Sequence, residues 1–437
     1  MTANEIQPST VPSPPAGARR RMWGWYLFDF ANSILIINGG LYFPQWIVVD
    51  NQISDLWFNV AIVLGSLVLL LTAAPLGVLS DRRWGSLPLL RYTSLAMFLG
   101  GLTIAAAGLL IPDRFARVTL SLFAFAVIMY AYQLSIVFYN VLLGRVSVRS
   151  DYGRVSGVGL AWGWIGGILG ILFIMPFVAG QVPFFQPAGR IQAILPSTIL
   201  YGVLVLTSLF LIRDADASLP SDGSSTDFKQ AFRGLIQNIR DLPHQKALWC
   251  FLLAYFLYSD AVLTIQNNST IYMERVLRLS DDMKAVEFII VLVTGAIGAI
   301  ASGRLTRGSG LRRSLQTTIW CWAIAVLVSG LIRDATWFTV LFAILGLLNG
   351  ALWNLSRVLF LQLIPVERRG EYFGIYSSYE RSATMIGPLI WSAVVISLPT
   401  LGTARYQLAW LTMAPILVVS AVLLSSVRLE TGNGKAA

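Results

Sequence analysis

The chain has 437 residues, of which 56% are hydrophobic and only 12% are charged. A soluble globular domain averages roughly 25% charged residues, so this composition excludes an ordinary soluble protein. The net charge of +10 could indicate nucleic-acid binding, but most of the 32 Lys and Arg residues fall in short segments on one side of the predicted membrane topology. This positive-inside bias predicts cytoplasmic termini, contact with membrane lipid and no nucleic-acid partner.

Twelve apolar runs follow a polar, Pro-rich tail at residues 1–21 that is predicted to be disordered. Each run approaches the length of about 20 residues that a membrane-spanning helix needs. Because lipid offers the backbone no hydrogen-bond partner, we expect all of these runs to be helices. The runs are Trp25–Val49, Leu56–Ser80, Pro88–Ile111, Val118–Leu143, Val155–Val178, Ala193–Ile212, Ala247–Thr270, Ala285–Ser302, Ser314–Ile332, Trp337–Ile364, Tyr372–Ile396 and Gln407–Val427.

A polar linker at residues 213–246 divides the runs into a first half, 22–212, and a second half, 247–428, followed by a short tail, 429–437. Its later part has helical apolar spacing, which predicts an amphipathic helix on the inner leaflet or a plain connecting helix. The halves repeat each other weakly, since Leu134-Ser135-x-Val137 returns as Leu355-Ser356-x-Val358. The predicted fold is therefore an all-α integral membrane protein with 12 transmembrane helices in two parallel six-helix repeats, the major facilitator fold.

Two acidic residues occupy matching positions in the two halves, Asp29 in the first run and Asp260 in the seventh. A carboxylate at the bilayer centre costs roughly 2.5–3.5 kcal/mol, which indicates a functional role. Asp260 follows Lys246 by 14 residues, or ~21 Å of helix, and so is expected near the midplane. We expect both acids to bind a coupling proton. The alternatives are an ion pair of Asp260 with Arg357 or Arg381, a helix-end contact for Asp29, and sodium bound by nearby side-chain oxygens.

Charged and polar residues inside the runs are the candidates for solute binding. Arg357 and Arg381 could each hold a substrate carboxylate through a guanidinium fork, or form a structural salt bridge. Glu380 precedes Arg381, so the two side chains point in different directions and cannot form an ideal pair with each other. Further candidates on the first, fourth, seventh and tenth runs, for which helix–helix hydrogen bonding is the alternative, are Asn32, Tyr132, Gln133, Tyr139, Asn140, Tyr258, Asn349, Trp353 and Asn354.

Several segments resemble a known family. They are Trp25–Ser33 in the first run, Val137–Leu143 in the fourth, Phe251–Asp260 in the seventh, and Glu371–Tyr376 with Gly387-Pro388-Leu389 in the eleventh. This combination resembles the vacuole effluxer-like family of the major facilitator superfamily, whose eukaryotic members release amino acids from the vacuole. The resemblance implies the fold and solute transport. The chain departs from the family pattern at Thr306-Arg307 and at Glu380-Arg381.

The loop after the second run, Gly77–Arg83, is similar to the signature loop of facilitators. The resemblance implies a conformational latch in which Gly77 allows the turn and Asp81, beside Arg82, holds the halves together. Arg145 or Arg154 would be the partner of Asp81. The alternative is a topology signal made of solvated charges.

Three other classes of protein are alternatives to a transporter. An intramembrane enzyme lacks support, because the only histidine, His244, lies in the linker and no P-loop is present. A lipid flippase of the same fold and a membrane receptor stay open. The sequence thus predicts a secondary active transporter of the plasma (inner) membrane. We expect it to act as a monomer without cofactor or metal, and to export an amino acid or similar small solute with protons.

Overall fold

The computed structural model describes residues 17–79, 85–146, 152–183, 185, 187–213, 246–305, 310–363, 376 and 386–427. Helices are the only regular secondary structure in these ranges. Ten of the helices are long and apolar enough to cross a membrane. This confirms a multi-pass helical membrane protein, while the count of twelve spans stays a prediction. The first helix is not among the ten, and much of the eleventh run, 377–385, lies outside the described residues.

The helices of the first half match the predicted runs to within a few residues at most ends. They alternate in direction because short turns join them, as expected for consecutive spans. The elements are α1 (Ala18–Gln45), which continues as the π-helix η1 (Trp46–Asp50), α2 (Asp55–Leu79), α3 (Ser86–Leu110), α4 (Arg114–Val146), α5 (Tyr152–Val178), the 3-10 helix η4 (Arg190–Ala193) and α6 (Ile194–Leu211).

The second half repeats this order. The predicted linker helix and the tails lie outside the described residues. The last run is divided into two helices that meet at Thr412. The elements are α8 (Lys246–Tyr272), continued by the π-helix η6 (Met273–Leu277), α9 (Asp281–Leu305), α10 (Leu311–Leu331), α11 (Ala335–Leu363), α13 (Ile386–Ser397), the 3-10 helix η8 (Pro399–Leu401), α14 (Ala404–Leu411) and α15 (Met413–Ser425).

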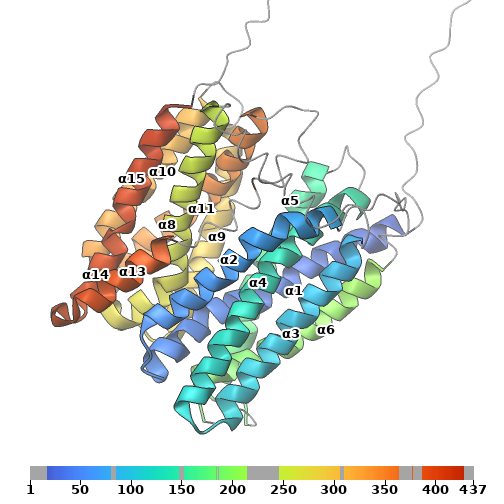
Figure 1. The fold of residues 1–437 in the computed structure, drawn as a ribbon, viewed down its shortest axis with the longest axis vertical. Coiled ribbons are helices and arrows are strands. Elements are labelled where there is room, and N and C mark those ends of the chain that lie inside the picture. Colours follow the sequence, from blue (N-terminus) through green and yellow to red (C-terminus); the bar gives the residue numbers. More distant parts are fainter. Residues whose placement is uncertain are drawn as a thin grey trace, which may run out of the picture.

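The two halves form separate bundles that lie side by side (Figure 1). Helix α1 begins and α15 ends at the same end of the molecule, which we call the terminal side. We call the opposite end, where η1 and η6 lie, the distal side. The halves touch through α2 with α13, α5 with α9 and α1 with α8.

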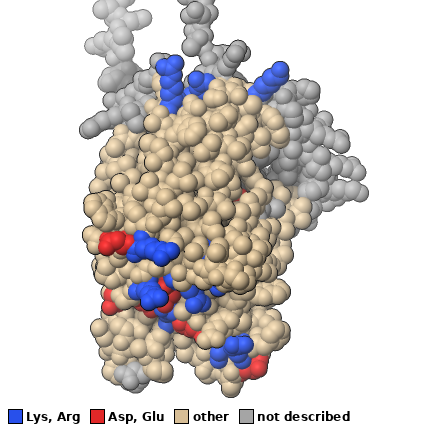
Figure 2. Space-filling model, turned by 90° about the vertical axis from the view of Figure 1, so that its left-hand side faces the viewer, with Lys and Arg blue, Asp and Glu red and all other residues tan. Residues whose placement is uncertain are grey.

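The outer surface of the bundle is apolar, as a lipid-facing surface requires. Many large hydrophobic side chains are exposed on it, including Leu110, Phe123, Ile300 and Leu331. On the face shown in Figure 2, Lys and Arg stand at the upper end and a mixed group of acidic and basic residues lies in the lower half. A broad band without charged side chains separates them, and it has the character of a membrane-facing belt.

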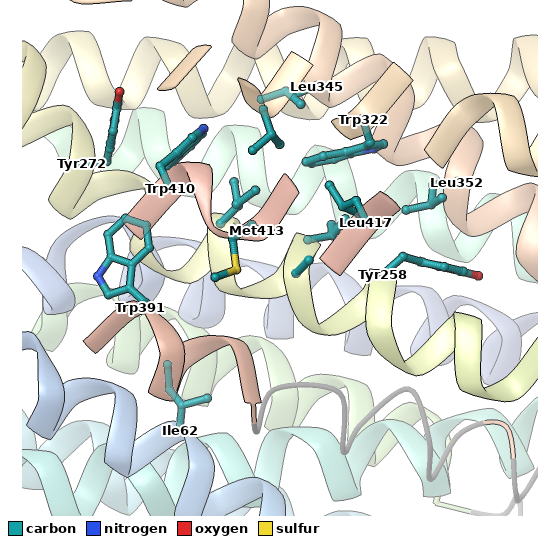
Figure 3. Packing of buried hydrophobic residues seen from close by; sticks show 14 of the residues in the cluster. Ile62, Tyr258, Tyr272, Trp322, Leu345, Leu352, Trp391, Trp410, Met413 and Leu417 are labelled. Carbon is teal, nitrogen blue, oxygen red and sulfur yellow. The ribbon is translucent and has the colours of Figure 1, made fainter. Parts of the chain in front are cut away.

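The core of the second half is built around aromatic side chains (Figure 3). Trp322, Trp391 and Trp410 are each at most 2% exposed, and Met413 and Leu417 fill the space between their helices. Ile62 from α2 of the first half belongs to the same cluster. The two halves therefore share a packed apolar surface where α2 meets α13.

Candidate functional site

A cluster of charged residues joins the two halves on the distal side. Arg190 of η4 binds Glu274 of η6, with 2.9 Å between Nη2 and Oε2, and Asp281 of α9, with 3.0 Å between Nε and Oδ2. It also binds Asp50 at the end of η1. Lys284 of α9 is fully buried, and its Nζ lies 2.7 Å from Asp281 Oδ1. These five residues, which we call the distal cluster, place two cations against three carboxylates.

The distal cluster is held together by charge-assisted hydrogen bonds. Lys284 also donates to Gln45 Oε1 of α1 and to the Glu274 carboxylate. Burial raises the pKa of the Asp50 carboxyl, and the neighbouring Arg190 opposes that rise. A pocket of about 400 Å³ opens beside the cluster and is lined in part by Arg190, Glu274 and Asp281. Because each half supplies part of the cluster, a relative movement of the halves must break it.

A second layer of contacts lies between the halves, deeper in the bundle. Trp391 of α13 donates its indole N–H to Asp55 of α2 at 2.9 Å. Asn59 of α2 donates to Ser392 at 2.9 Å and exchanges hydrogen bonds with Asn268 of α8. Asn59 and Asn268 are fully buried. Among the described residues, every hydrogen bond between the halves lies in one of these two layers or next to them, so the halves are joined at the distal side.

Asp29 lies on α1 against the fifth helix. A Cβ added to Gly163 of α5 would come within 2.5 Å of Asp29 Oδ2, so only glycine leaves room for this carboxylate. No hydrogen bond or ion pair to Asp29 is present in the described parts of the chain. One turn later, Asn32 is 1% exposed, and neither its amide nitrogen nor its oxygen has a partner there. A buried amide without partners is unusual and marks a place where water or a ligand can bind.

Two of the family-like segments meet beside Asp29. Trp25 stacks on Tyr139 of α4 with ring centroids 4.1 Å apart, and its indole N–H donates to the Tyr139 carbonyl oxygen at 3.0 Å. Phe28 also stacks on Tyr139. The first-run and fourth-run segments therefore form one packing unit, which fixes the rotation of α1 and thus the direction of Asp29.

Asp260 is fully buried on α8 and faces the eleventh run. Its Oδ2 accepts a hydrogen bond of 2.6 Å from the backbone N–H of Gly387, in the first turn of α13. A side chain at Gly387 would collide with Thr264, whose Oγ1 would lie 2.2 Å from the added Cβ. Tyr255 of the same segment stacks on Tyr376 at 4.4 Å. The seventh-run and eleventh-run segments are thus in direct contact.

Arg357 and Arg381 are the proposed ion-pair partners of Asp260. Arg357 of α11 is exposed, and within the described ranges it forms no ion pair. Arg381 and Glu380 lie outside the described residues, as do Asp81 and Arg82 of the predicted latch. Gly77, Arg145 and Arg154 lie within α2, α4 and α5, whereas their surroundings fall outside what is described. The latch and the roles of Glu380 and Arg381 stay predictions.

The other predicted solute-binding residues do not form one group. Asn349 and Trp353 of α11 lie toward α8, since Asn349 Oδ1 accepts hydrogen bonds from Gln266 at 3.1 Å and from Trp353 at 2.8 Å. Asn354 instead faces α9 and donates to Ser302 Oγ at 2.9 Å. Tyr258 is fully buried in the core and shares a hydrogen bond of 2.6 Å with Ser356.

On the fourth helix, Tyr132 and Gln133 are half-buried and Asn140 is exposed.

The sequence did not predict the distal cluster, nor a buried acid in the same helix as Lys284. Glu287 of α9 is 1% exposed and lies against the Thr339 hydroxyl of α11. The signal was present, because Glu287 is an acidic residue within the predicted eighth run. The cluster itself had no comparable signal, since its partners are far apart in the chain.

Solved structures with the same arrangement of helices are transporters. A nucleoside transporter, NupG in its D323A form, superposes with a TM-score of 0.71 at 13% identity, covering 93% of this chain and 99% of that one. A D-xylose-proton symporter superposes with a TM-score of 0.68 at 14% identity, covering 94% and 97%. The chain therefore has the same fold as these two proteins.

The sequence comparisons give the family. The model described as "Vacuole effluxer Atg22 like" matches residues 143–437, and the chain belongs to that family. An uncharacterized MFS-type transporter, YxiO of Bacillus subtilis, is 25% identical over 301 residues, with 68% of each chain covered. Autophagy-related protein 22-1 of Penicillium rubens is 26% identical over 285 residues. That match covers 60% of this chain and 48% of the fungal protein.

Proposed function

We propose that the protein is a secondary active transporter that moves a small organic solute by alternating access and couples the movement to protons. The single observation that supports this most directly is the position of the contacts between the halves. They join the halves at the distal side, and buried acidic residues lie on helices that face the boundary. This is the position expected for a closed gate on the distal side of an alternating-access transporter.

The terminal side is proposed to be cytoplasmic, since most of the Lys and Arg residues in the predicted loops fall on it. The distal cluster would then close the outer gate of a plasma-membrane protein. Export of an amino acid or a similar metabolite is the favoured direction, because the family model is named for an effluxer. Asp29 and Asp260 are the proposed coupling acids. They lie on equivalent helices of the two halves, the first and the seventh, as the internal repeat predicts.

The test is proton flux in proteoliposomes that enclose a pH-sensitive dye and contain purified protein. Pooled amino acids are added first and single ones afterwards. We expect solute-dependent proton flux, which Asp260→Asn abolishes because the amide cannot release a proton. Asn keeps an oxygen that can accept from the Gly387 N–H, so this variant should fold normally.

A matched control is Asp334→Asn, since Asp334 caps α11 at the exposed distal end, where its Oδ1 accepts from the Trp337 N–H at 3.1 Å. Flux that is unchanged in Asp260→Asn would contradict the coupling role of Asp260. No flux with any amino acid, from sealed and correctly inserted protein, would contradict amino-acid–proton transport. Labelled-lipid translocation in the same vesicles would then favour a flippase.

A further inference from the structure

Glu287 is a buried acid that the proposed coupling pair leaves unused. It lies six residues after Asp281, which places it ~9 Å along α9 from the distal end. The residue is 1% exposed, and its Oε2 atom has no hydrogen-bond partner among the described residues. It forms no ion pair within the same ranges. A charged carboxylate in such a place would carry a large desolvation cost that only the contact with the Thr339 hydroxyl could offset in part.

The contact of Glu287 with α11 indicates its protonation state. Glu287 Oε1 lies against the Thr339 hydroxyl, which also lies 3.0 Å from the Ala335 carbonyl oxygen. A threonine hydroxyl carries one proton and can donate to only one of these oxygens, and the Ala335 carbonyl can only accept. When Thr339 donates to Ala335, the contact with Glu287 is a hydrogen bond only if the carboxyl group itself donates. A protonated Glu287 thus satisfies both contacts at once.

The groups around Glu287 also leave it without a balancing cation. Lys284 lies one turn toward the distal side on the same helix, but its ammonium is already bound by Glu274, Asp281 and Gln45. From α1, Tyr42 packs in the same apolar cluster as Ala285, and α5 adds only apolar side chains to that cluster. The distal cluster already has an excess of carboxylate. The cations of the cluster are thus already paired with carboxylates and do not balance a charge on Glu287.

We propose that Glu287 is a proton-binding site of the transport cycle, loaded from the distal side. This rests on the proposed proton-coupled transport. In the proposed cycle, the closed distal cluster and Gln45 keep the distal solution away from Glu287. Separation of the halves breaks the contacts of Arg190 with Glu274 and Asp281 and of Lys284 with Gln45. Water then reaches Lys284 and, one turn further, the Glu287 carboxyl, which exchanges its proton with that side.

The test reads the proton itself by infrared difference spectroscopy of the full-length protein in lipid nanodiscs at neutral pH. We expect the wild type to show a carbonyl-stretch band of a protonated carboxylic acid that Glu287→Gln lacks. Thr339→Val should shift the same band to higher frequency, because the carboxyl loses its hydrogen-bond partner. Asp29→Asn and Asp260→Asn should leave the band in place. In D₂O the band should exchange several-fold faster in Arg190→Ala, which opens the distal cluster.

Loss of a carboxylate band instead of an acid band in Glu287→Gln would overturn the proposal. If Glu287→Gln fails to fold, Thr339→Val alone tests whether Glu287 is protonated. An acid band that Thr339→Val leaves unshifted would contradict the proposal. Exchange that Arg190→Ala leaves unchanged would overturn loading from the distal side. The wild-type flux assay reports separately on coupled transport. An acid band without flux contradicts that function and leaves the protonated site, whereas flux without the band contradicts the Glu287 proposal alone.

Discussion

The Arg190 guanidinium of the first half lies 2.9 Å from the Glu274 carboxylate of the second half. Arg190 stands on a 3-10 turn just before α6, and Glu274 lies in the π-helical end of the seventh helix. Both positions are at the ends of helices, and the two helices belong to different halves. The pair therefore reports whether the distal side is closed, in the same way as the other contacts of the distal cluster.

Replacement of Arg190 by alanine should open the distal side. The variant loses the contacts with Glu274 and Asp281 across the boundary, and each partly exposed pair contributes on the order of 1 kcal/mol. Loss of both, about 2 kcal/mol, changes the ratio of closed to open molecules by up to roughly thirtyfold, since 1.4 kcal/mol corresponds to a factor of ten. The measurement uses spin labels at Ser54→Cys and Thr400→Cys, in a protein with Cys250 and Cys321 replaced by serine. We expect a larger share of molecules at a longer distance between the two labels in Arg190→Ala.

Arg278 provides the matched control for that experiment. It lines the same distal pocket and is exposed, yet the structure gives it no ion pair among the described residues. Arg278→Ala should leave the distance distribution as in the wild type. An equal response of both variants would show that general loss of positive charge, not the specific bridge across the halves, controls the distal side.

Substitution of Gly387 tests the link between the seventh and eleventh runs. Gly387→Ala places a Cβ 2.2 Å from Thr264 Oγ1 and 3.1 Å from Asp260 Oδ2, so the hydrogen bond from the Gly387 N–H to Asp260 must shift. We expect loss of most transport and a lower melting temperature. Gly387→Ala with Thr264→Ala removes the colliding hydroxyl and should recover part of both, measured as a double-mutant cycle. Additive losses in the double variant would contradict a direct steric cause.

The sequence predicted the helices well because the length of a span follows from the thickness of the bilayer. The third run, Pro88–Ile111, corresponds to α3 at Ser86–Leu110, for example. Directions of side chains were harder to predict, because these helices are apolar on all sides and their pattern does not mark the inward face. Tyr258 was expected to contact solute, yet it is buried in the core of the second half.

Contacts between residues far apart in the chain could not be predicted from the sequence. Lys284 lies just outside the predicted run Ala285–Ser302, and Glu287 lies within it. Their roles depend on how α9 packs against α1 and α11, which no local pattern encodes. Asp29 and Asp260 are candidates from the sequence because an internal repeat and the high cost of burying a carboxylate both point to them, and their coupling role stays a prediction.

Gly163 controls the direction of Asp29, and its substitution by alanine should separate transport from folding. The new Cβ would lie 2.5 Å from Asp29 Oδ2, and the Asp29 carboxylate is the end of a side chain that can rotate away. The melting temperature should therefore change little, while solute-dependent proton flux should fall severalfold or more. Gly40→Ala in α1 is the control, because a Cβ there meets nothing within 4 Å. A large loss of stability in Gly163→Ala, or equal flux in both variants, would show that Gly163 serves only close helix packing.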